Sequence, residues 1–142
     1  MATYDASVNT NNSVRSNRTY SDLNLNFNKN PATKDVAKLK DVEAVKRAVR
    51  NLILTNRFER PFHPEIGSDV RALLFENMTP LTALNLERKV QEVLINFEPR
   101  AKISSVVAEP LEDRNAYHLQ VSFYVVGIQT PVVVETFLQR LR

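Results

Sequence analysis

The chain has 142 residues and 43% hydrophobic content, which suits one hydrophobic core and is too short for two domains of typical size. It contains no cysteine, which excludes disulfides and thiol chemistry, and no stretch approaches the roughly 18 apolar residues that a membrane span requires. The net charge of +3 comes from residues 1–40, since residues 41–142 hold thirteen basic and thirteen acidic residues. We therefore expect a soluble protein from a reducing compartment, with neither a membrane nor a nucleic acid as partner.

Residues 1–31 are rich in Asn and Ser and poor in large apolar side chains. Such a segment cannot bury enough surface to offset its ordering entropy, so we expect a flexible or partner-ordered N-terminal arm. Its candidate anchors on a partner are the large apolar residues Tyr20, Leu23, Leu25 and Phe27. The last three alternate with polar residues, so this part either stays disordered or adds as a strand to a sheet edge. Residues 32–142 are expected to form one α+β domain.

The first predicted helix spans residues 42–55. Asp41 is a favoured N-cap residue, and Glu43 falls in the first turn, where negative charge suits the helix dipole. Apolar residues then recur at helical spacing, at Val42, Val45, Val49, Leu52 and Ile53.

A structured loop is predicted for residues 56–67, because this stretch holds two prolines and a glycine. We expect Gly67 to adopt a backbone conformation closed to other residues, and Phe62 to cover the core. Ser68 can then cap a short helix over residues 69–75.

The longest predicted helix spans residues 80–97. Thr79 is a favourable N-cap, and Pro80 is a favoured first helical residue. Apolar side chains follow at intervals of three and four, at Ala83, Leu86, Val90, Val93, Leu94 and Phe97. The helix must end there, because Pro99 disfavours a helical conformation at the preceding residue.

Beyond Arg100 the hydrophobic period changes from helical to strand-like, which predicts strands at residues 101–109, 117–125 and 132–138. Short turns separate the three segments. Helices first and strands later, joined by short turns, predict an α+β fold in which two main helices and a short one pack on an antiparallel three-stranded sheet.

Catalytic, metal and cofactor sites find little support in the residues. Of the two histidines, His118 is expected on a polar strand face, and His63 with Glu65 supplies too few ligands for a metal. A glycosidase needs two carboxylates across a sugar, and the candidates are Glu65, Asp69, Glu76 and Glu98. Spacing does not pair them, and with two glycines there is no phosphate-binding loop. We therefore predict no enzyme, no cofactor and no bound metal.

The segment Glu98-Pro99-Arg100 places an acid, a rigid corner and a guanidinium at the junction between the longest helix and the sheet. Arg100 can bind carboxylates or helix-end carbonyls of another chain. Alternatively, Glu98 and Arg100 pair with each other or within the fold. The residues alone leave both interpretations open.

Four segments, in order, resemble one family. They are Tyr20-Ser21-Asp22, Arg60-Pro61-Phe62-His63-Pro64-Glu65-Ile66-Gly67-Ser68-Asp69, Leu74-Phe75-Glu76-Asn77-Met78-Thr79-Pro80-Leu81-Thr82 and Asn96-Phe97-Glu98-Pro99-Arg100. Together they resemble the small baseplate wedge subunit of T-even-type contractile-tailed phages, which is related to a baseplate component of type VI secretion systems. The match spans most of residues 20–100.

The resemblance implies a structural protein of the virion tail baseplate, assembled in the host cytoplasm and present in several copies. It implies that Glu98, Pro99 and Arg100 dock on the helical core bundle of the larger wedge subunits. It also implies that the C-terminal sheet resembles a domain of the tail sheath protein and templates the first sheath ring by strand addition.

For the loop, the same resemblance implies that Phe62 and Ile66 pack internally and that Arg60 and His63 contact a partner. Family members have been described as lysozyme-like, so a cell-wall glycosidase is the alternative function.

Overall fold

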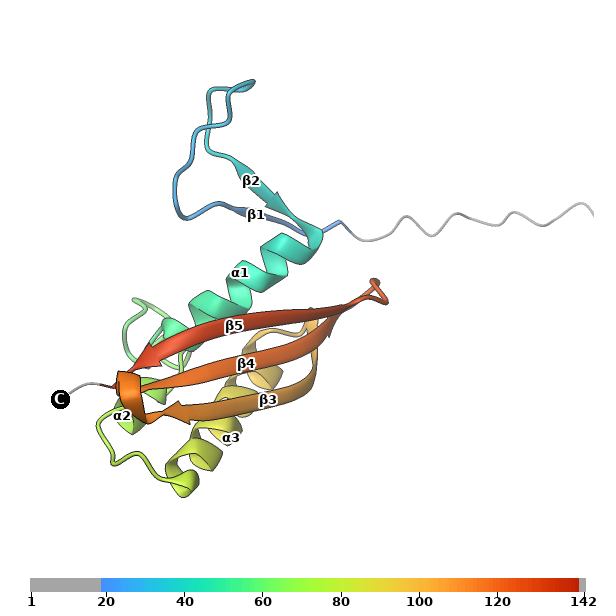
Figure 1. The fold of residues 1–142 in the computed structure, drawn as a ribbon. Helices are drawn as coiled ribbons and strands as arrows, with labels where there is room; N and C mark the ends of the chain where they lie inside the picture. Colours follow the sequence, from blue (N-terminus) through green and yellow to red (C-terminus); the bar gives the residue numbers. More distant parts are fainter. Residues whose placement is uncertain (1–18, 141–142) are drawn as a thin grey trace, which may run out of the picture.

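The computed structural model describes residues 19–140, so residues 1–18 of the predicted arm lie outside the described part. The elements, in order, are β1 (Ser21–Leu23), β2 (Lys38–Lys40), α1 (Asp41–Leu54), α2 (Val70–Leu73), α3 (Pro80–Phe97), β3 (Ala101–Leu111), the 3-10 turn η2 (Glu112–Arg114), β4 (Ala116–Val125) and β5 (Pro131–Gln139). The helices lie against one face of the C-terminal sheet, and the hairpin β1–β2 stands at the start of α1 (Figure 1). The predicted α+β fold is confirmed.

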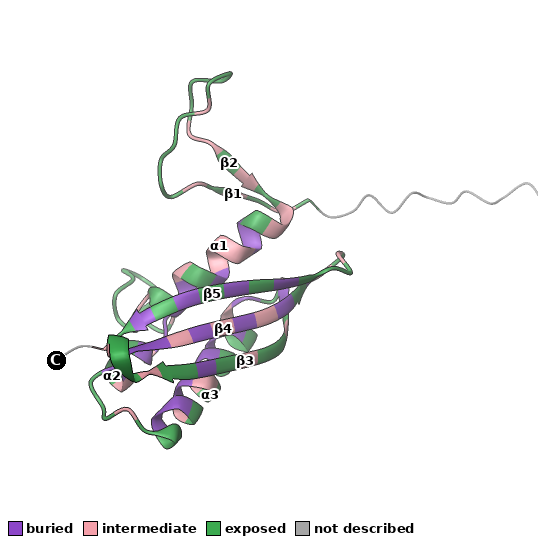
Figure 2. Cartoon of the chain, viewed as in Figure 1, coloured by how far each residue is buried: buried purple, intermediate pink, exposed green. Residues whose placement is uncertain are grey.

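The C-terminal sheet has the strand order β3-β4-β5, and both pairings are antiparallel. β5 alternates strictly between exposed and buried residues (Figure 2), and the buried residues of the sheet pack in one core with those of the helices. The core joins the buried side of the sheet to the apolar faces of α1 and α3, and its fully buried side chains include Val45, Leu86, Leu94, Tyr117 and Phe123. The three strands predicted from period-two alternation are therefore confirmed. Within residues 19–140, no helix combines the length and the hydropathy needed to cross a membrane.

Helix α3 begins and ends as predicted. Thr79 is its N-cap and accepts a hydrogen bond from the Thr82 amide at 3.1 Å, and Pro80 occupies the first turn. The helix ends at Phe97, two residues before Pro99.

Two capping predictions are wrong. The N-cap of α1 is Lys40, and the Asp41 carboxylate instead accepts the backbone N–H of Tyr20 at 3.1 Å. Ser68 is buried and donates its hydroxyl to the Ile53 carbonyl at 2.5 Å, so it does not cap α2, which is also shorter than predicted. In both cases the side chain that was predicted to cap a helix forms its hydrogen bond with a residue distant in sequence instead.

The loop between α1 and α2 is closed at its base by an isolated bridge between Asn56 and Ser68. Gly67 has a φ of +155°, and a Cβ there would lie 2.5 Å from the backbone carbonyl carbon of Asn56, so the predicted requirement for glycine is confirmed. Phe62 does not cover the core, because it lies at the tip of this closed loop and is 95% exposed. Ile66, near the base, packs against the core as predicted.

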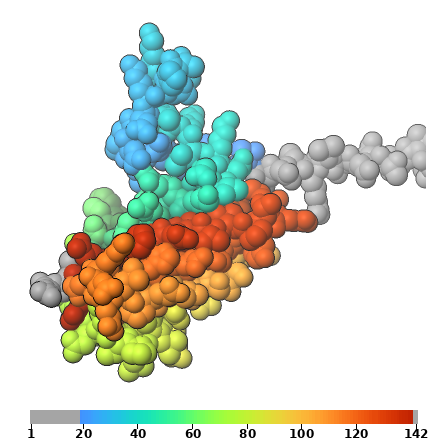
Figure 3. All heavy atoms as spheres, viewed as in Figure 1, coloured from blue at the N-terminus to red at the C-terminus, as the bar shows by residue number. Residues whose placement is uncertain are grey.

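The N-terminal hairpin projects from the body of the protein (Figure 3). Ser21–Leu23 pairs with Lys38–Lys40, and a further bridge joins Lys29 to Val36. Of the segment with strand-like alternation, only the part up to Leu23 forms a strand, and this strand pairs with another segment of the same chain. The hairpin contains residues from both sides of position 31. The boundary between arm and domain at that position stays a prediction.

Candidate functional site

A groove of about 510 Å³ opens where α3 gives way to β3. Its walls come from β1 and the following turn, from α1, from the loop before α2 and from the helix–sheet junction. Of the residues singled out in the sequence, it brings together Leu23, Leu25, Arg60, Glu98 and Arg100. The groove is therefore the candidate partner-binding site.

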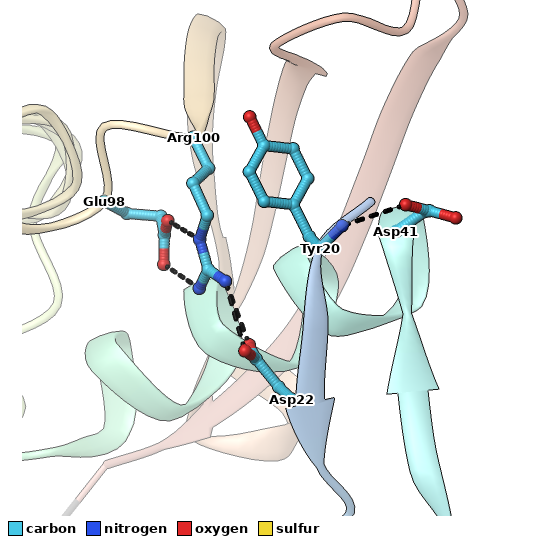
Figure 4. Close-up of polar contacts among 5 residues, drawn as sticks. All are labelled: Tyr20, Asp22, Asp41, Glu98 and Arg100. Carbon is cyan, nitrogen blue, oxygen red and sulfur yellow. Dashed lines mark hydrogen bonds and ion pairs between the residues drawn. The ribbon is translucent and has the colours of Figure 1, made fainter. Parts of the chain in front are cut away.

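Arg100 lies at the centre of the junction and binds Glu98 through two parallel hydrogen bonds (Figure 4). Its Nε donates to Glu98 Oε1 at 2.6 Å, and its Nη2 donates to Glu98 Oε2 at 2.9 Å. Glu98 is only 5% exposed, so its carboxylate depends on this guanidinium for its charge partner. The intramolecular pairing that the sequence left open is present.

The same guanidinium also binds the hairpin. Arg100 Nη1 donates to Asp22 Oδ2 at 3.1 Å and to Oδ1 at 3.3 Å. Its pKa is raised from the ordinary value, first because Glu98 accepts its hydrogen bonds and further because Asp22 adds a second negative charge. We call Glu98, Arg100 and Asp22 the charged clasp, since it joins the helix–sheet junction to β1.

Tyr20 reinforces the charged clasp from the side (Figure 4). Its ring centroid lies 5.7 Å from the guanidinium carbon of Arg100, within the range of a cation–π contact. Its hydroxyl donates to the Val126 carbonyl at 3.4 Å, and its backbone exchanges hydrogen bonds with Asp41. Tyr20, predicted as an anchor on a partner, is thus anchored on its own chain.

The chemistry of the groove suits binding and not proton transfer. A guanidinium has five N–H donors, does not deprotonate in proteins and binds carboxylates through a planar fork. Glu98 and Asp22 both face this permanent cation. Sequence reasoning missed the role of Asp22, although the Tyr20-Ser21-Asp22 segment of the family resemblance contains it.

The groove does not include Phe27, His63 or Pro99. Phe27 is 73% exposed in the hairpin, and Pro99 is exposed beside the charged clasp. His63 lies in the exposed loop with its Nδ1 3.2 Å from Glu65 Oε1. The pKa of Glu65 is lowered, first by a hydrogen bond from its own backbone and then by the hydrogen bond to His63. Across residues 19–140, no three metal-ligating side chains of His, Asp or Glu gather into a possible ion site.

His118 lies on the outer side of β4 as predicted, but it is less exposed than a simple surface residue. Its ring stacks on Phe137 with a centroid distance of 4.9 Å. Its Nε2 lies 3.6 Å from a carboxylate oxygen of Glu135 on β5. The outer face of the sheet thus carries an ordered cluster of its own.

Comparison with known proteins gives a consistent result. The profile of a family described as "Baseplate wedge protein gp25" matches residues 40–128. The chain is 36% identical over 110 residues to the baseplate wedge protein gp25 of Enterobacteria phage T4, which covers 78% of this chain and 83% of that protein.

Solved structures agree on the fold. A putative tail lysozyme from Geobacter sulfurreducens has a TM-score of 0.66 at 25% identity, over 70% of this chain and 91% of its own. A chain of the baseplate of the anti-feeding prophage has a TM-score of 0.62 at 21% identity, over 87% of this chain and 88% of its own. Together with the family match, these similarities confirm the resemblance drawn from the sequence: the chain belongs to the gp25 family of baseplate wedge proteins, whose place is the tail baseplate of the virion.

Proposed function

We propose that this protein is a structural subunit of the baseplate wedge that docks through its groove onto the helical core bundle of the larger wedge subunits. The observation that carries the proposal is the convergence of Glu98, Arg100, Arg60 and exposed leucines on one groove. Pro99 is exposed at its rim. The subunit is present in several copies and assembles in the host cytoplasm, in line with its family.

The groove offers both kinds of contact that a helical bundle needs. Leu23 and Leu25 line it and are more than half exposed, so a partner helix that covers them gains apolar burial. Arg60 supplies an exposed positive charge on the same rim. Arg100 keeps N–H groups beyond those that bind Glu98 and Asp22, and these can reach helix-end carbonyls of the partner.

Strand addition to the C-terminal sheet is the second part of the proposal, with the tail sheath protein as the incoming chain. An open three-stranded sheet has two edge strands, and an edge strand presents unpaired backbone groups to another chain. The wedge would then set the register of the first sheath ring, because backbone pairing fixes register wherever one face of a strand is buried.

The alternative of a cell-wall glycosidase is disfavoured by the carboxylates. A glycosidase needs one carboxyl group with a raised pKa as the general acid. Glu65 is exposed and its pKa is lowered, Glu98 is held by Arg100, and Asp69 lies 3.5 Å from Arg57. We therefore propose a non-enzymatic role, and the similarity to a putative tail lysozyme supports a shared fold.

Co-purification with the larger wedge subunits tests the docking role. Arg100 is a poor choice for substitution, because it also neutralises the buried Glu98. Leu25→Glu places a charge in the groove without touching the core, and Leu81→Glu, on a leucine of α3 that is also more than half exposed, is the matched control. We expect Leu25→Glu to reduce recovery of the complex at least about tenfold and Leu81→Glu to leave it unchanged. Equal recovery with both variants, each folded by circular dichroism, would refute docking through this groove.

A peptidoglycan clearing assay tests the alternative. We expect the purified protein to leave a cell-wall suspension turbid. Clearing that disappears in Glu65→Gln would instead establish the glycosidase.

A further inference from the structure

The two edges of the C-terminal sheet differ in their backbone groups. Pairing of β3 with β4 turns the amides of residues 106, 108 and 110 outward. Position 110 is proline, which has no N–H, and the Ala108 amide already donates to Glu87 Oε1 of α3 at 2.9 Å. A bulge between Ile103 and Ser105 interrupts the strand further. Each of these features protects an edge against strand addition.

The edge formed by β5 lacks such protection. The Arg140 amide donates to the Asn115 carbonyl, and the unbroken register with β4 then turns the backbone groups of Val133, Glu135, Phe137 and Gln139 outward. None of these four amides has a hydrogen-bond partner among the described residues. They form an uninterrupted row of donors at every second residue, which is the pattern that an incoming strand requires.

Helix α1 runs beside this edge (Figure 1), and two hollows lie between the helix and the strand, which together we call the trough. At the start of β5, a hollow of about 310 Å³ lies between Val133 and Glu135 on one side and Arg47 and Arg50 on the other. At the end of β5, a hollow of about 250 Å³ is lined mainly by apolar side chains, among them Ile53, Leu54 and Leu74, with Arg71 as its one charged lining residue. The trough is thus mainly charged and polar at one end and mainly apolar at the other.

The charged end has an excess of positive charge. Lys46, Arg47 and Arg50 line it against two carboxylates, Glu43 and Glu135, and Glu43 already pairs with Lys46 at 3.0 Å. Arg47 uses one Nη to bind Asn26, but its Nε is buried and has no hydrogen-bond partner within residues 19–140. Arg50 is exposed and forms no ion pair in the same part of the chain.

We propose that the β5 edge is the strand-acceptor edge, and that it takes an extended partner segment with acidic side chains opposite Arg47 and Arg50 and apolar side chains at its other end. This inference rests on the proposed strand addition and adds to it the edge and the chemistry of the incoming strand. The outward amides of β5 provide the backbone ladder, and the excess of arginine favours acidic side chains at one end of the strand.

Fluorescent peptides of ten residues test the proposal on the full chain by anisotropy. The probes alternate valine and threonine and carry three glutamates at one end, with one version for each strand direction, and matched peptides carry lysines instead. We expect one of the glutamate peptides to bind at least about tenfold more tightly than its lysine counterpart. The double variant Arg47→Glu and Arg50→Glu should bind the lysine peptide more tightly than the glutamate peptide. Arg88→Glu, an exposed control on α3, should keep the preference for the glutamate peptide.

A backbone test separates the two edges. Val133→Pro removes one outward amide of β5, and Val106→Pro removes the matching outward amide of β3. We expect only Val133→Pro to weaken the binding of the glutamate peptide, by about tenfold or more, with folding checked by circular dichroism. Equal loss from both proline variants, or equal binding of glutamate and lysine peptides, would overturn the proposal.

The charge variants decide the question if Val133→Pro does not fold. Arg47 lines both the groove and the trough, whereas Arg50 lines only the trough and Arg60 only the groove. Arg50→Glu alone should therefore weaken binding of the glutamate peptide, and Arg60→Glu should leave it intact. Failure of groove docking and failure of the β5 acceptor are therefore separate results.

Discussion

The body of the protein and its N-terminal hairpin are held together by different forces. The body encloses a continuous apolar core between α1, α3 and the sheet, whereas the hairpin exposes most of its large apolar side chains. Polar contacts join the hairpin to the body, mainly Arg100 with Asp22 and Tyr20 with Asp41. Apolar burial of this extent fixes a structure, while a few polar contacts at a partly exposed site contribute little net stability. We therefore expect the body to unfold as one cooperative unit, and the hairpin to open locally at a lower free energy.

The largest expected effect comes from a leucine pair. Leu86→Ala removes a fully buried side chain of α3 and should lower the free energy of unfolding by about 3 kcal/mol. Leu23→Ala removes an exposed side chain of the hairpin and should change it by less than about 0.5 kcal/mol. Urea denaturation followed by circular dichroism measures both. Similar losses would mean that the hairpin shares the core, and the contrast between the two regions would not stand.

Arg100→Ala tests the contact point between the regions and should cost about 2 to 3 kcal/mol, because it leaves the buried Glu98 carboxylate without a cation. Adding Glu98→Gln removes that charge and should restore more than half of the loss, again measured by urea denaturation. Arg88→Ala, on the exposed face of α3, provides the baseline. Absence of rescue by Glu98→Gln would indicate that Arg100 acts through packing and not through charge.

Asp22→Asn should loosen the hairpin alone. The substitution weakens the ion pair to Arg100 without stranding a buried charge, so global stability should fall by at most about 1 kcal/mol. Hydrogen exchange of amides in residues 21–40 should accelerate, while exchange in β4 stays the same. Asp113→Asn, at an exposed position of η2, is the control. Equal acceleration in β4 would show that the hairpin and the body open together.

The smallest expected effect concerns the exposed loop. His63→Ala should raise the pKa of Glu65 toward 4.5 without reaching it, because the backbone hydrogen bond, which lowers the pKa most, remains. A lowered pKa stabilises the fold above the unfolded pKa, and this stabilisation is lost as the pH falls through the folded pKa. The variant should therefore lose less stability below about pH 4.5. NMR titration of the Glu65 carboxyl measures the shift, and an unchanged pKa would exclude the His63 contact in solution.

The sequence predicted those elements whose signals are local. α3 carries its own N-cap, first-turn proline and terminating proline, and β4 alternates without interruption, so both were predicted to within one residue. The Phe62 prediction failed because exposure depends on where the loop closes, and that is decided by the bridge between Asn56 and Ser68. Asp41 and Ser68 failed as caps for the same reason, since each found a partner far along the chain.

The groove itself was beyond prediction from spacing. Arg60, Leu25 and Arg100 were each singled out, but no periodicity places three separate segments side by side. The family resemblance pointed to Glu98-Pro99-Arg100, and only the fold reveals that Asp22 occupies one side of Arg100.

The charged clasp has a consequence for the order of events in assembly. It spans 78 positions of the chain, and the groove has walls from both ends of that span. A chain that has not closed its hairpin onto the finished helix–sheet junction therefore has no groove to offer. With docking through the groove as proposed above, a copy whose hairpin is open should dock poorly, so that entry into the baseplate depends on completed folding.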